Sequence, residues 1–430
     1  MYYRRLGSTG LWVSEISFGT IPILQGDVPV LPSYFDLDED AALAVMEHAY
    51  RLGCNLYDTA IVPEYGDAEI KLGKFAARVG RERIVISDKA RFFDGGEMYK
   101  AVETSCENLG TTPDIYFVHQ VDAAHEEEVF GRGGALDALA ELKAEGKIRF
   151  AGIATHYYDI LLRGAMDDRV DVLQGSGNLL ERGMLDRVRA DSRFYAHGHP
   201  EETCQQKLTG ARRASWEEPS SSIVHGHPEE TCQQKLTGAR RASWEERPSS
   251  IVHGHPELRG EERALSCLSK KGFLVNKVYA AGLLPARFSE QSLIGFALSY
   301  PVSSVLVGLG TKEQVDAALG WDARDPGAAV PDFDEVLSVL EKEYTPIPCD
   351  RCQRCVCPHG TEIHTLFRQY QYFHLGKDYW ALKKLGLGIA ESARHCRECV
   401  EMPCMDACPR KIRIAQEMQR VEQLVIDHAF

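Results

Sequence analysis

The sequence predicts an α/β fold, a (β/α)8 barrel, followed by a small α-helical domain rich in cysteine. Two observations lead to this prediction. Short apolar runs alternate with amphipathic helical stretches from Ser14 to about Gly320, and eight of the 13 cysteines lie between Cys349 and Cys408. A barrel of this kind usually takes ~250 residues, so a chain of 430 residues has room for a second domain.

Eight apolar runs are the candidate strands of the barrel. Near-continuous apolar strands are typical of a parallel sheet covered by helices on both faces, and eight such units favour a closed barrel. No Gly-x-Gly-x-x-Gly turn follows the first run, which argues against an open dinucleotide-binding sheet. The runs are 16–18, 55–58, 84–86, 115–118, 150–154, 170–173, 273–278 and 305–307.

Helices are expected between these runs, because apolar residues recur there at helical spacing. Leu43, Met46 and Tyr50 show this spacing for a helix over residues 40–52. Glycine is favoured at helix C-termini, and on this ground helices are expected to end at Gly53, Gly110, Gly146 and Gly272.

Overall charge and hydropathy exclude several classes of protein. The formal net charge is −14, so the chain lacks the positive surface that nucleic-acid binding requires. No apolar run of ~18 residues occurs, and no apolar stretch follows a basic start, so neither a membrane span nor a secretion signal is expected. We therefore expect a cytoplasmic protein without nucleic-acid or membrane partners.

One interval interrupts the barrel pattern between the sixth and seventh runs. Residues 197–224 and 225–252 are two 28-residue repeats that differ at two positions, and a third copy begins at His253. We expect an insertion over 183–260 that arose by duplication and is disordered, because its polar composition buries too little apolar surface to offset ordering entropy. The His-Gly-His motifs and the two cysteines of the repeats leave metal binding as an alternative.

Four polar residues follow consecutive predicted strands: Asp58 and Tyr65 the second, Lys89 the third and His119 the fourth. The carboxyl ends of barrel strands share one rim, so these side chains can converge. Each alone has an ordinary structural explanation, but together they suit carbonyl reduction. A charged lysine held by an aspartate would lower the pKa of a proton-donating tyrosine, and a histidine would polarise the carbonyl.

The motifs around these residues resemble those of the aldo-keto reductase family. The resemblance covers residues 4 to about 320 apart from the insertion, within a barrel domain expected over 1–325. It implies that Asp58, Tyr65, Lys89 and His119 are the catalytic tetrad, with Tyr65 as general acid, of an NAD(P)H-dependent aldehyde or ketone reductase. The segments that carry it include Arg5-Leu6-Gly7, Gly53-x-Asn55-x-x-Asp58-Thr59-Ala60, Tyr65-Gly66-x-Ala68-Glu69-x-x-Leu72-Gly73, His119-Gln120-x-Asp122, Gly146-Lys147-Ile148-Arg149 and Asn178-Leu179-Leu180.

The resemblance also implies cofactor contacts at the same rim. Gln174 matches the family's carboxamide-binding glutamine, and the family's usual aromatic residue after the seventh strand falls near Asn276 or Lys277. The stretch after the last strand lacks the arginine and the Glu-Asn pair that many members place around the adenosine, so NADPH and NADH both stay open. The candidate contacts are Gly19, Thr20, Asp58, Gln174, Lys277, Gly308, Gly310 and Gln314.

The clustered cysteines form two quartets that each end in Cys-Pro. In two-cluster ferredoxins the cysteine before proline typically ligates the other cluster. We therefore expect two [4Fe–4S] clusters in a helical, ferredoxin-type domain over 346–430, with helical structure that includes 366–385 and a linker or helix over 326–345; four-thiolate zinc sites are the alternative. The expected ligands are Cys349, Cys352, Cys355 and Cys408 for one cluster and Cys357, Cys396, Cys399 and Cys404 for the other.

The role of such clusters is open at this point. They could transfer electrons, with a redox protein as partner, or only stabilise a domain too small to fold alone. Hydride transfer moves two electrons whereas a cluster moves one, and no flavin site is recognisable in the sequence. The alternative function for the whole chain is an iron–sulfur electron-transfer or sensing protein whose barrel is catalytically weak.

Overall fold

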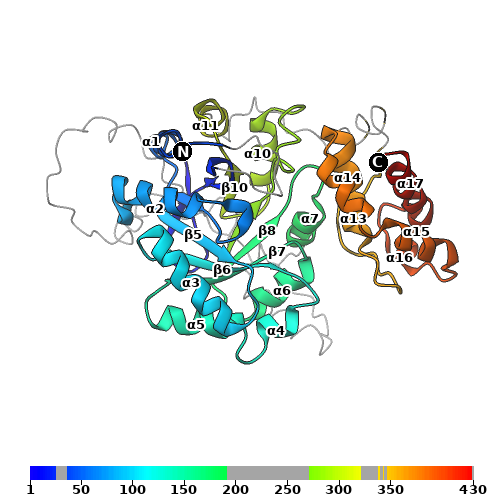
Figure 1. Cartoon of the computed structure of the whole chain (residues 1–430), viewed down its shortest axis with the longest axis horizontal. Coiled ribbons are helices and arrows are strands. Elements are labelled where there is room, and N and C mark those ends of the chain that lie inside the picture. The colour runs from blue at the N-terminus through cyan, green and yellow to red at the C-terminus, as the bar shows by residue number, and fades with distance from the viewer. Residues whose placement is uncertain (26–35, 191–270, 321–337, 339–341, 343–345, 429–430) are drawn as a thin grey trace, which may run out of the picture. The chain divides into compact units, whose positions relative to one another are not determined.

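Eight parallel strands close into a barrel in the order β10-β3-β4-β5-β6-β7-β8-β9 (Figure 1). The computed structural model describes residues 1–25, 36–190, 271–320, 338, 342 and 346–428. Every expected apolar run overlaps a strand of the barrel, so the predicted barrel is confirmed. The strands are β3 (Ile16–Gly19), β4 (Leu56–Asp58), β5 (Val85–Ala90), β6 (Ile115–Val121), β7 (Phe150–Thr155), β8 (Val172–Ser176), β9 (Gly272–Asn276) and β10 (Ser304–Gly308).

Helices follow the strands around the barrel (Figure 1). Gly53, Gly110 and Gly146 follow helices with positive φ, as expected for residues that end helices. Gly272 is different, because it is the first residue of β9, where a Cβ atom would meet the side chain of Leu6. The helices are α1 (Glu39–Arg51), α2 (Ala68–Val79), α3 (Gly95–Leu109), α4 (Glu126–Phe130), α5 (Ala135–Ala144), α6 (Tyr158–Met166), α7 (Gly183–Ala190), α10 (Glu290–Leu298) and α11 (Lys312–Leu319).

An antiparallel hairpin precedes the barrel and was not predicted. Its strands are β1 (Tyr3–Arg5) and β2 (Trp12–Ser14). Leu6 and Val13 of this hairpin are fully buried in one cluster with side chains of the barrel interior, such as Phe117. The hairpin therefore closes the end of the barrel where the strands begin, and the other end is left for a functional site.

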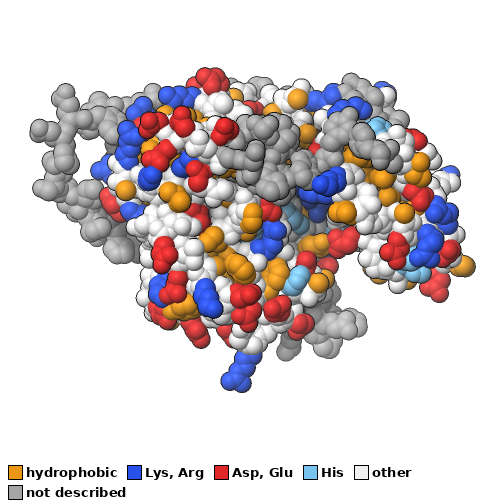
Figure 2. Space-filling model, viewed as in Figure 1, with side chains coloured by type: hydrophobic (Ala, Val, Ile, Leu, Met, Phe, Trp, Pro, Cys, Tyr) orange, Lys and Arg blue, Asp and Glu red, His pale blue; other side chains and the backbone are white. Residues whose placement is uncertain are grey.

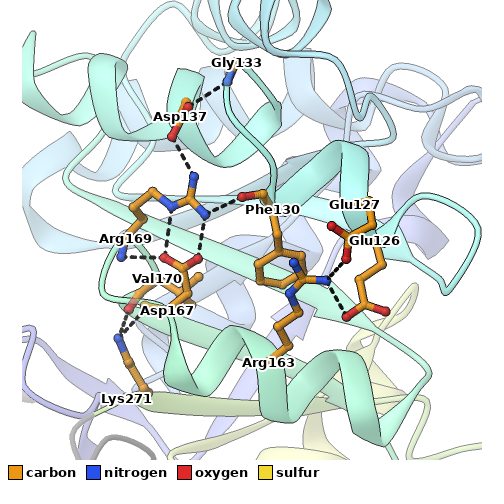
Figure 3. A network of polar contacts seen from close by, with 10 residues as sticks. All are labelled: Glu126, Glu127, Phe130, Gly133, Asp137, Arg163, Asp167, Arg169, Val170 and Lys271. Atoms are coloured by element: carbon orange, nitrogen blue, oxygen red, sulfur yellow. Dashed lines mark hydrogen bonds and ion pairs between the residues drawn. The ribbon is translucent and has the colours of Figure 1, made fainter.

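A network of charged residues joins α4, α5 and α6 (Figure 3). Arg169 contacts Asp137 at 2.6 Å and donates a hydrogen bond of 2.8 Å to the Phe130 carbonyl, while Arg163 contacts Glu126 at 2.7 Å. These contacts hold the segment that follows β6, the strand that carries His119. Acidic and basic side chains are interspersed over the face of the molecule in Figure 2.

The C-terminal segment is helical where the structure describes it. The stretch 366–385, expected to be helical, lies on two helices, because Lys377 takes a left-handed conformation with φ 54° and ends the first. Tyr372 and Phe373 pack in the barrel's hydrophobic cluster, whereas Phe367 packs in the core that contains the cysteines. The helices are α13 (Ile363–Gly376), α14 (Tyr379–Gly386), α15 (Ile389–Glu398), α16 (Pro403–Ala407) and α17 (Ile414–Asp427).

Two sequence predictions fall wholly or mostly on residues that are not described. The 28-residue repeats, with their expected disorder and the alternative of metal binding, lie outside the described residues, and so does nearly all of the linker over 326–345. Among the helices that are described, none is both long and apolar enough to cross a membrane.

Candidate active site

A buried ion pair lies at the carboxyl end of the barrel. The Lys89 ammonium on β5 lies 2.6 Å from a carboxylate oxygen of Asp58 on β4 and donates a second hydrogen bond of 2.6 Å to the Thr59 carbonyl. Ser87 donates to the other Asp58 oxygen at 2.7 Å. The side chains of Lys89 and Asp58 are only 1% and 5% exposed, so both charges rely on each other and on these hydrogen bonds.

Tyr65 lies beside this pair, on the short 3-10 helix Pro63–Tyr65 after β4. The Lys89 ammonium is 5.1 Å from the centre of the Tyr65 ring. Burial raises the pKa of Tyr65 above its usual value near 10, and the opposing effect of Lys89 does not cancel it. The expected lowering of this pKa is therefore not found in the structure, and Tyr65 is held as a protonated phenol.

Lys89 stays charged although it is buried. Burial alone would lower its pKa, but Asp58, with smaller contributions from Tyr65 and Asp88, outweighs that effect, and the pKa of Lys89 is raised above its usual value. A lysine that is charged beside a protonated tyrosine can stabilise the phenolate that remains once the tyrosine has given up its proton.

His119 completes the predicted tetrad from β6. The pairing of β6 with β7 shifts between His119 and Val121, and Gln120 between them has a φ of 56°, so a bulge sets the direction of the histidine. Burial, followed by Lys89 and other cations, lowers the pKa of His119 well below 6.5. A neutral imidazole results, and its Nδ1 atom has no hydrogen-bond partner among the described residues.

The predicted contacts at the nicotinamide end divide into two kinds. Gln174 on β8 is fully buried and donates to Asp58 at 3.1 Å, while its Oε1 atom has no partner among the described residues. The amide and hydroxyl groups of Thr20 both donate to the Asp58 carbonyl at 3.0 Å. A Cβ atom on Gly19 would lie 3.3 Å from the carbonyl oxygen of Val307. The Oε1 atom of Gln174 is thus left to accept a hydrogen bond from a ligand. Thr20 and Gly19 instead hold β3 against its neighbouring strands.

The predicted contacts after β10 have structural roles of their own. Gln314 accepts a hydrogen bond from the Gly310 amide at 2.8 Å and caps the start of α11 together with Thr311. A Cβ atom on Gly308 or Gly310 would lie 3.0 or 3.2 Å from side-chain atoms of Pro22. These three residues thus fix the end of β10 through contacts within the barrel. None of them is an arginine or a lysine that could pair with a phosphate.

Lys277 follows β9 directly and has a left-handed backbone with φ 62°. Asn178 donates a hydrogen bond of 3.1 Å to its carbonyl. Burial and then the nearby cations Arg368 and Lys89 lower the pKa of Lys277 to about 8. The structure thus brings this predicted residue to the same rim as the tetrad.

The first cysteine loop packs directly against the same rim. Gln353 accepts a hydrogen bond of 2.7 Å from the Tyr158 amide and donates one to the His156 carbonyl, just after β7. The Gly183 amide, after β8, donates 2.8 Å to the Asp350 carbonyl, and a Cβ atom on Gly183 would overlap with Cys352. No motif in the sequence predicts these contacts.

A buried carboxylate anchors this junction. Glu181, after β8, contacts Arg351 at 3.0 Å and Arg368 on α13 at 2.9 Å. Its side chain is 1% exposed, and the two arginines outweigh burial so that the pKa of Glu181 is lowered. The partners are more than 160 residues apart in the chain, which is why sequence reasoning missed them.

The eight clustered cysteines line two small cavities, four cysteines in each. The structure brings together the same two sets of four that the Cys-Pro rule gave. Nowhere in the described part of the chain do three or more His, Cys, Asp or Glu side chains surround a position for a single metal ion, and the ten cysteines described there are all free thiols. The first cavity is lined by Cys349, Cys352, Cys355 and Cys408, and the second by Cys357, Cys396, Cys399 and Cys404.

Backbone amides in the first cysteine loop point at sulfur atoms. Arg351 and Gln353 both have φ 60°, and the Arg351 amide hydrogen-bonds to the Cys349 sulfur. Burial, and then neighbouring thiols and carboxylates, raise the pKa of Cys352 to about 11. Loops of this kind, with amides converging on one concavity, bind anionic groups and iron–sulfur clusters.

Comparison with known proteins finds one family that the barrel resembles. Residues 15–196 match the model of the Aldo/keto reductase family. The chain is 34% identical over 168 residues to the "L-galactose dehydrogenase" of Arabidopsis thaliana, covering 36% of this chain and 49% of that protein. It is 28% identical over 200 residues to the "NADH-specific methylglyoxal reductase" of Escherichia coli strain K12, covering 42% and 60%. The chain thus spans about half the length of the curated relatives it matches.

Solved structures with low sequence identity were also found. An aldo-keto reductase of Bacillus halodurans in its holo form is 18% identical with a TM-score of 0.48, covering 79% of this chain and 95% of that one. An aldo/keto reductase of Klebsiella pneumoniae in complex with NADP and acetate is 17% identical with a TM-score of 0.45, covering 80% and 95%. The family model and the curated relatives together support the aldo/keto reductase family for this chain.

Proposed function

We propose that this barrel, whose residues 15–196 match the Aldo/keto reductase family, reduces an aldehyde or ketone by hydride transfer from NAD(P)H. The observation that carries the proposal is the buried Lys89–Asp58 pair beside Tyr65, with the Lys89 ammonium 5.1 Å from the ring centre. NAD(P)H supplies the hydride when it is bound, and the residues at the rim supply the proton and the electrostatic stabilisation.

Each member of the tetrad has a distinct part in this chemistry. Neutral His119 donates a hydrogen bond to the carbonyl oxygen and polarises it. Tyr65, protonated at neutral pH, gives its proton to the oxyanion that forms. Lys89 stabilises the phenolate left on Tyr65, and Asp58 keeps Lys89 charged and in place.

The nicotinamide end of the rim fits a carboxamide. Gln174 has a buried acceptor oxygen without a partner among the described residues, and the same is true of Asn276 at the end of β9. A carboxamide NH₂ would satisfy such an acceptor, and a buried acceptor left unpaired costs about 1–3 kcal/mol. The adenosine end offers no such feature, so we propose NAD(P)H without a preference for either form.

We further propose that each cysteine cavity holds a [4Fe–4S] cluster, which supplies one-electron transfer when bound. The support is that four thiols from separate parts of the sequence line each cavity, and that backbone amides point at the sulfurs. Thiolates crowded into one buried cavity repel one another, and cationic iron offsets that repulsion. A cytoplasmic location suits such a centre, because free thiols persist there.

The deciding experiment is anaerobic purification of the full chain followed by two measurements on one sample. Metal analysis should give about eight iron and eight sulfide per chain, as two [4Fe–4S] clusters require. Fluorescence titration should show saturable binding of NADPH, NADH or both. Zinc without sulfide would overturn the clusters but leave the reductase proposal intact.

A second candidate function has one observation in its favour. The first cysteine loop packs on the rim of the barrel, where Gln353 is hydrogen-bonded to the residues that follow β7. Such a contact would suit an iron–sulfur electron-transfer or sensing protein. In that protein the barrel would be catalytically weak, and a redox protein would be the partner. Iron and sulfide in the expected amounts, together with no saturable binding of either nicotinamide cofactor, would favour this function over the reductase.

A further inference from the structure

Several cations gather at the open end of the barrel although the chain as a whole carries a net charge of −14. The charged groups that act most strongly on His119 are Lys89, Arg91 and Lys277, and all three are cations. His156, which follows β7 on the same rim, is likewise surrounded by arginine and lysine. Lys89 and Arg91 are already paired with Asp58 and Glu64, so a cation of this group that has no such partner is the one that can attract an anionic ligand.

Lys277 is the member of this group without a counter-ion of its own. No hydrogen bond or ion pair of its ammonium is found among the described residues, and its side chain is partly exposed. Its left-handed backbone, with φ 62°, is uncommon for a long side chain and is held by the 3.1 Å hydrogen bond from Asn178. Residues held in uncommon backbone conformations cluster at active sites and ligand-binding segments.

The groups around Lys277 come from several elements. Arg368 lies on α13, Lys384 on α14 and Lys89 on β5, and all three repel its charge. Glu181 attracts it, but this carboxylate is already shared between Arg351 at 3.0 Å and Arg368 at 2.9 Å. The pKa of Lys277, lowered to about 8 by burial and these cations, agrees with a cation that lacks an anion.

We propose that Lys277 binds a carboxylate of the substrate, so that the carbonyl compounds this protein reduces are oxo acids or aldehydes that carry a carboxylate. This inference rests on the proposed reductase function and names its substrate class. The phosphates of the cofactor are the other anions at hand. The position of Lys277 favours the substrate, because Lys277 directly follows β9 at the rim that carries the tetrad, whereas the predicted adenosine contacts lie at the end of β10 and beyond it.

The test uses pairs of carbonyl compounds that differ in one charge. We would compare kcat/KM for 4-carboxybenzaldehyde and methyl 4-formylbenzoate, and for pyruvate and methyl pyruvate, in wild type, Lys277→Met and Lys277→Arg. The acid-to-ester ratio should fall at least about tenfold in Lys277→Met, mainly through KM, as expected when a hydrogen bond to a charged group is lost. Lys277→Arg should retain most of the ratio, and Lys100→Met, on an exposed lysine of α3, should leave it unchanged. An unchanged ratio in Lys277→Met for both pairs would overturn the proposal.

Two binding measurements separate the sources of the anion and keep the test independent of turnover. The NADPH and NADH dissociation constants of Lys277→Met should stay within about twofold of wild type, whereas weaker cofactor binding with an unchanged ratio would assign Lys277 to a cofactor phosphate. Calorimetry should show that benzoate binds more tightly than benzamide to wild type but not to Lys277→Met. If no carbonyl compound is reduced, the reductase proposal fails, and this calorimetric difference still decides whether Lys277 forms an anion site.

Discussion

The barrel and the cysteine-rich segment hold their functional side chains in different ways. In the barrel, Lys89 and Asp58 already contact each other at 2.6 Å within a wall formed by a large buried cluster. In the C-terminal segment, Cys396, Cys404 and Cys408 are themselves part of the hydrophobic core, and they face cavities. The barrel is therefore complete without its ligand, whereas the core of the C-terminal segment includes the groups that would bind one. Small domains of this kind usually need a metal to fold.

The largest expected effect is a loss of turnover in the barrel without a change in its fold. Tyr65→Phe removes the proposed proton donor, so kcat should fall by about 10²–10⁴-fold. Cofactor dissociation constants should stay near wild type, because the phenol ring and the Lys89–Asp58 pair remain. Steady-state kinetics and fluorescence titration measure both quantities.

Tyr99→Phe is the matched control, because the Tyr99 hydroxyl on α3 donates to Glu145 at the surface, at 2.6 Å. Its activity should equal that of wild type. Full activity in Tyr65→Phe would remove Tyr65 from the mechanism and with it the main support for the reductase function.

The next effect concerns the cysteine-rich segment, where ligand and fold should be lost together. Cys396→Ser removes one of the four thiols of the second cavity, so bound iron should fall by about half, with increased proteolysis after residue 346. Cys106→Ser, on a partly exposed helix of the barrel, should change neither. Iron analysis and limited proteolysis with mass spectrometry make the comparison. Equal iron in both variants would show that Cys396 is not a ligand.

Sequence reasoning succeeded where the signal is local. The eight strands follow from apolar runs such as 115–118, and the convergence of Asp58, Lys89 and His119 follows from their positions after consecutive strands. The two cysteine sets follow from the Cys-Pro rule.

It failed where distant contacts decide the result. The pKa of Tyr65 is raised, not lowered, because burial outweighs Lys89, and burial depends on the whole rim. Glu181 and Arg368, which contact each other, lie so far apart in the chain that no sequence pattern connects them. The N-terminal hairpin escaped prediction because its strands, Tyr3–Arg5 and Trp12–Ser14, are too short to show an alternating pattern.

The junction between the two regions gives a third prediction. Glu181→Gln leaves Arg351 and Arg368 buried without a full counter-charge, which should cost about 3–5 kcal/mol of unfolding free energy. Asp159→Asn is the control, because Asp159 is 76% exposed and its 3.0 Å contact with Arg187 should be worth less than about 1 kcal/mol. Urea unfolding followed by circular dichroism measures both. Equal midpoints in the two variants would mean that the junction contributes nothing to stability.

The smallest effect lies inside the barrel wall, on the strand that carries Lys89. Asp88 directly precedes Lys89 on β5. Its side chain faces Glu69 of α2, and both side chains are buried. Burial first, and then the neighbouring Glu69 carboxylate, raise the pKa of Asp88 well above its usual value near 3.8. Because two carboxylates cannot share this site without a proton, the folded state binds a proton that the unfolded state releases.

This pair makes the stability of the barrel depend on pH in a defined direction. A raised pKa in the folded state stabilises the barrel fully below about pH 4, and that contribution is lost as pH rises through the folded-state pKa. Asp88→Asn replaces the shared proton with an amide donor, so the free energy of unfolding should decline less from pH 5 to 8 and be higher at pH 8 by on the order of 1 kcal/mol, as measured by urea unfolding at each pH. Asp168→Asn, at an exposed aspartate, should follow the wild-type profile. If the pH profile of Asp88→Asn also runs parallel to that of wild type, the two carboxyl groups share no proton. The Asp88–Glu69 pair then makes no contribution to the pH dependence of stability.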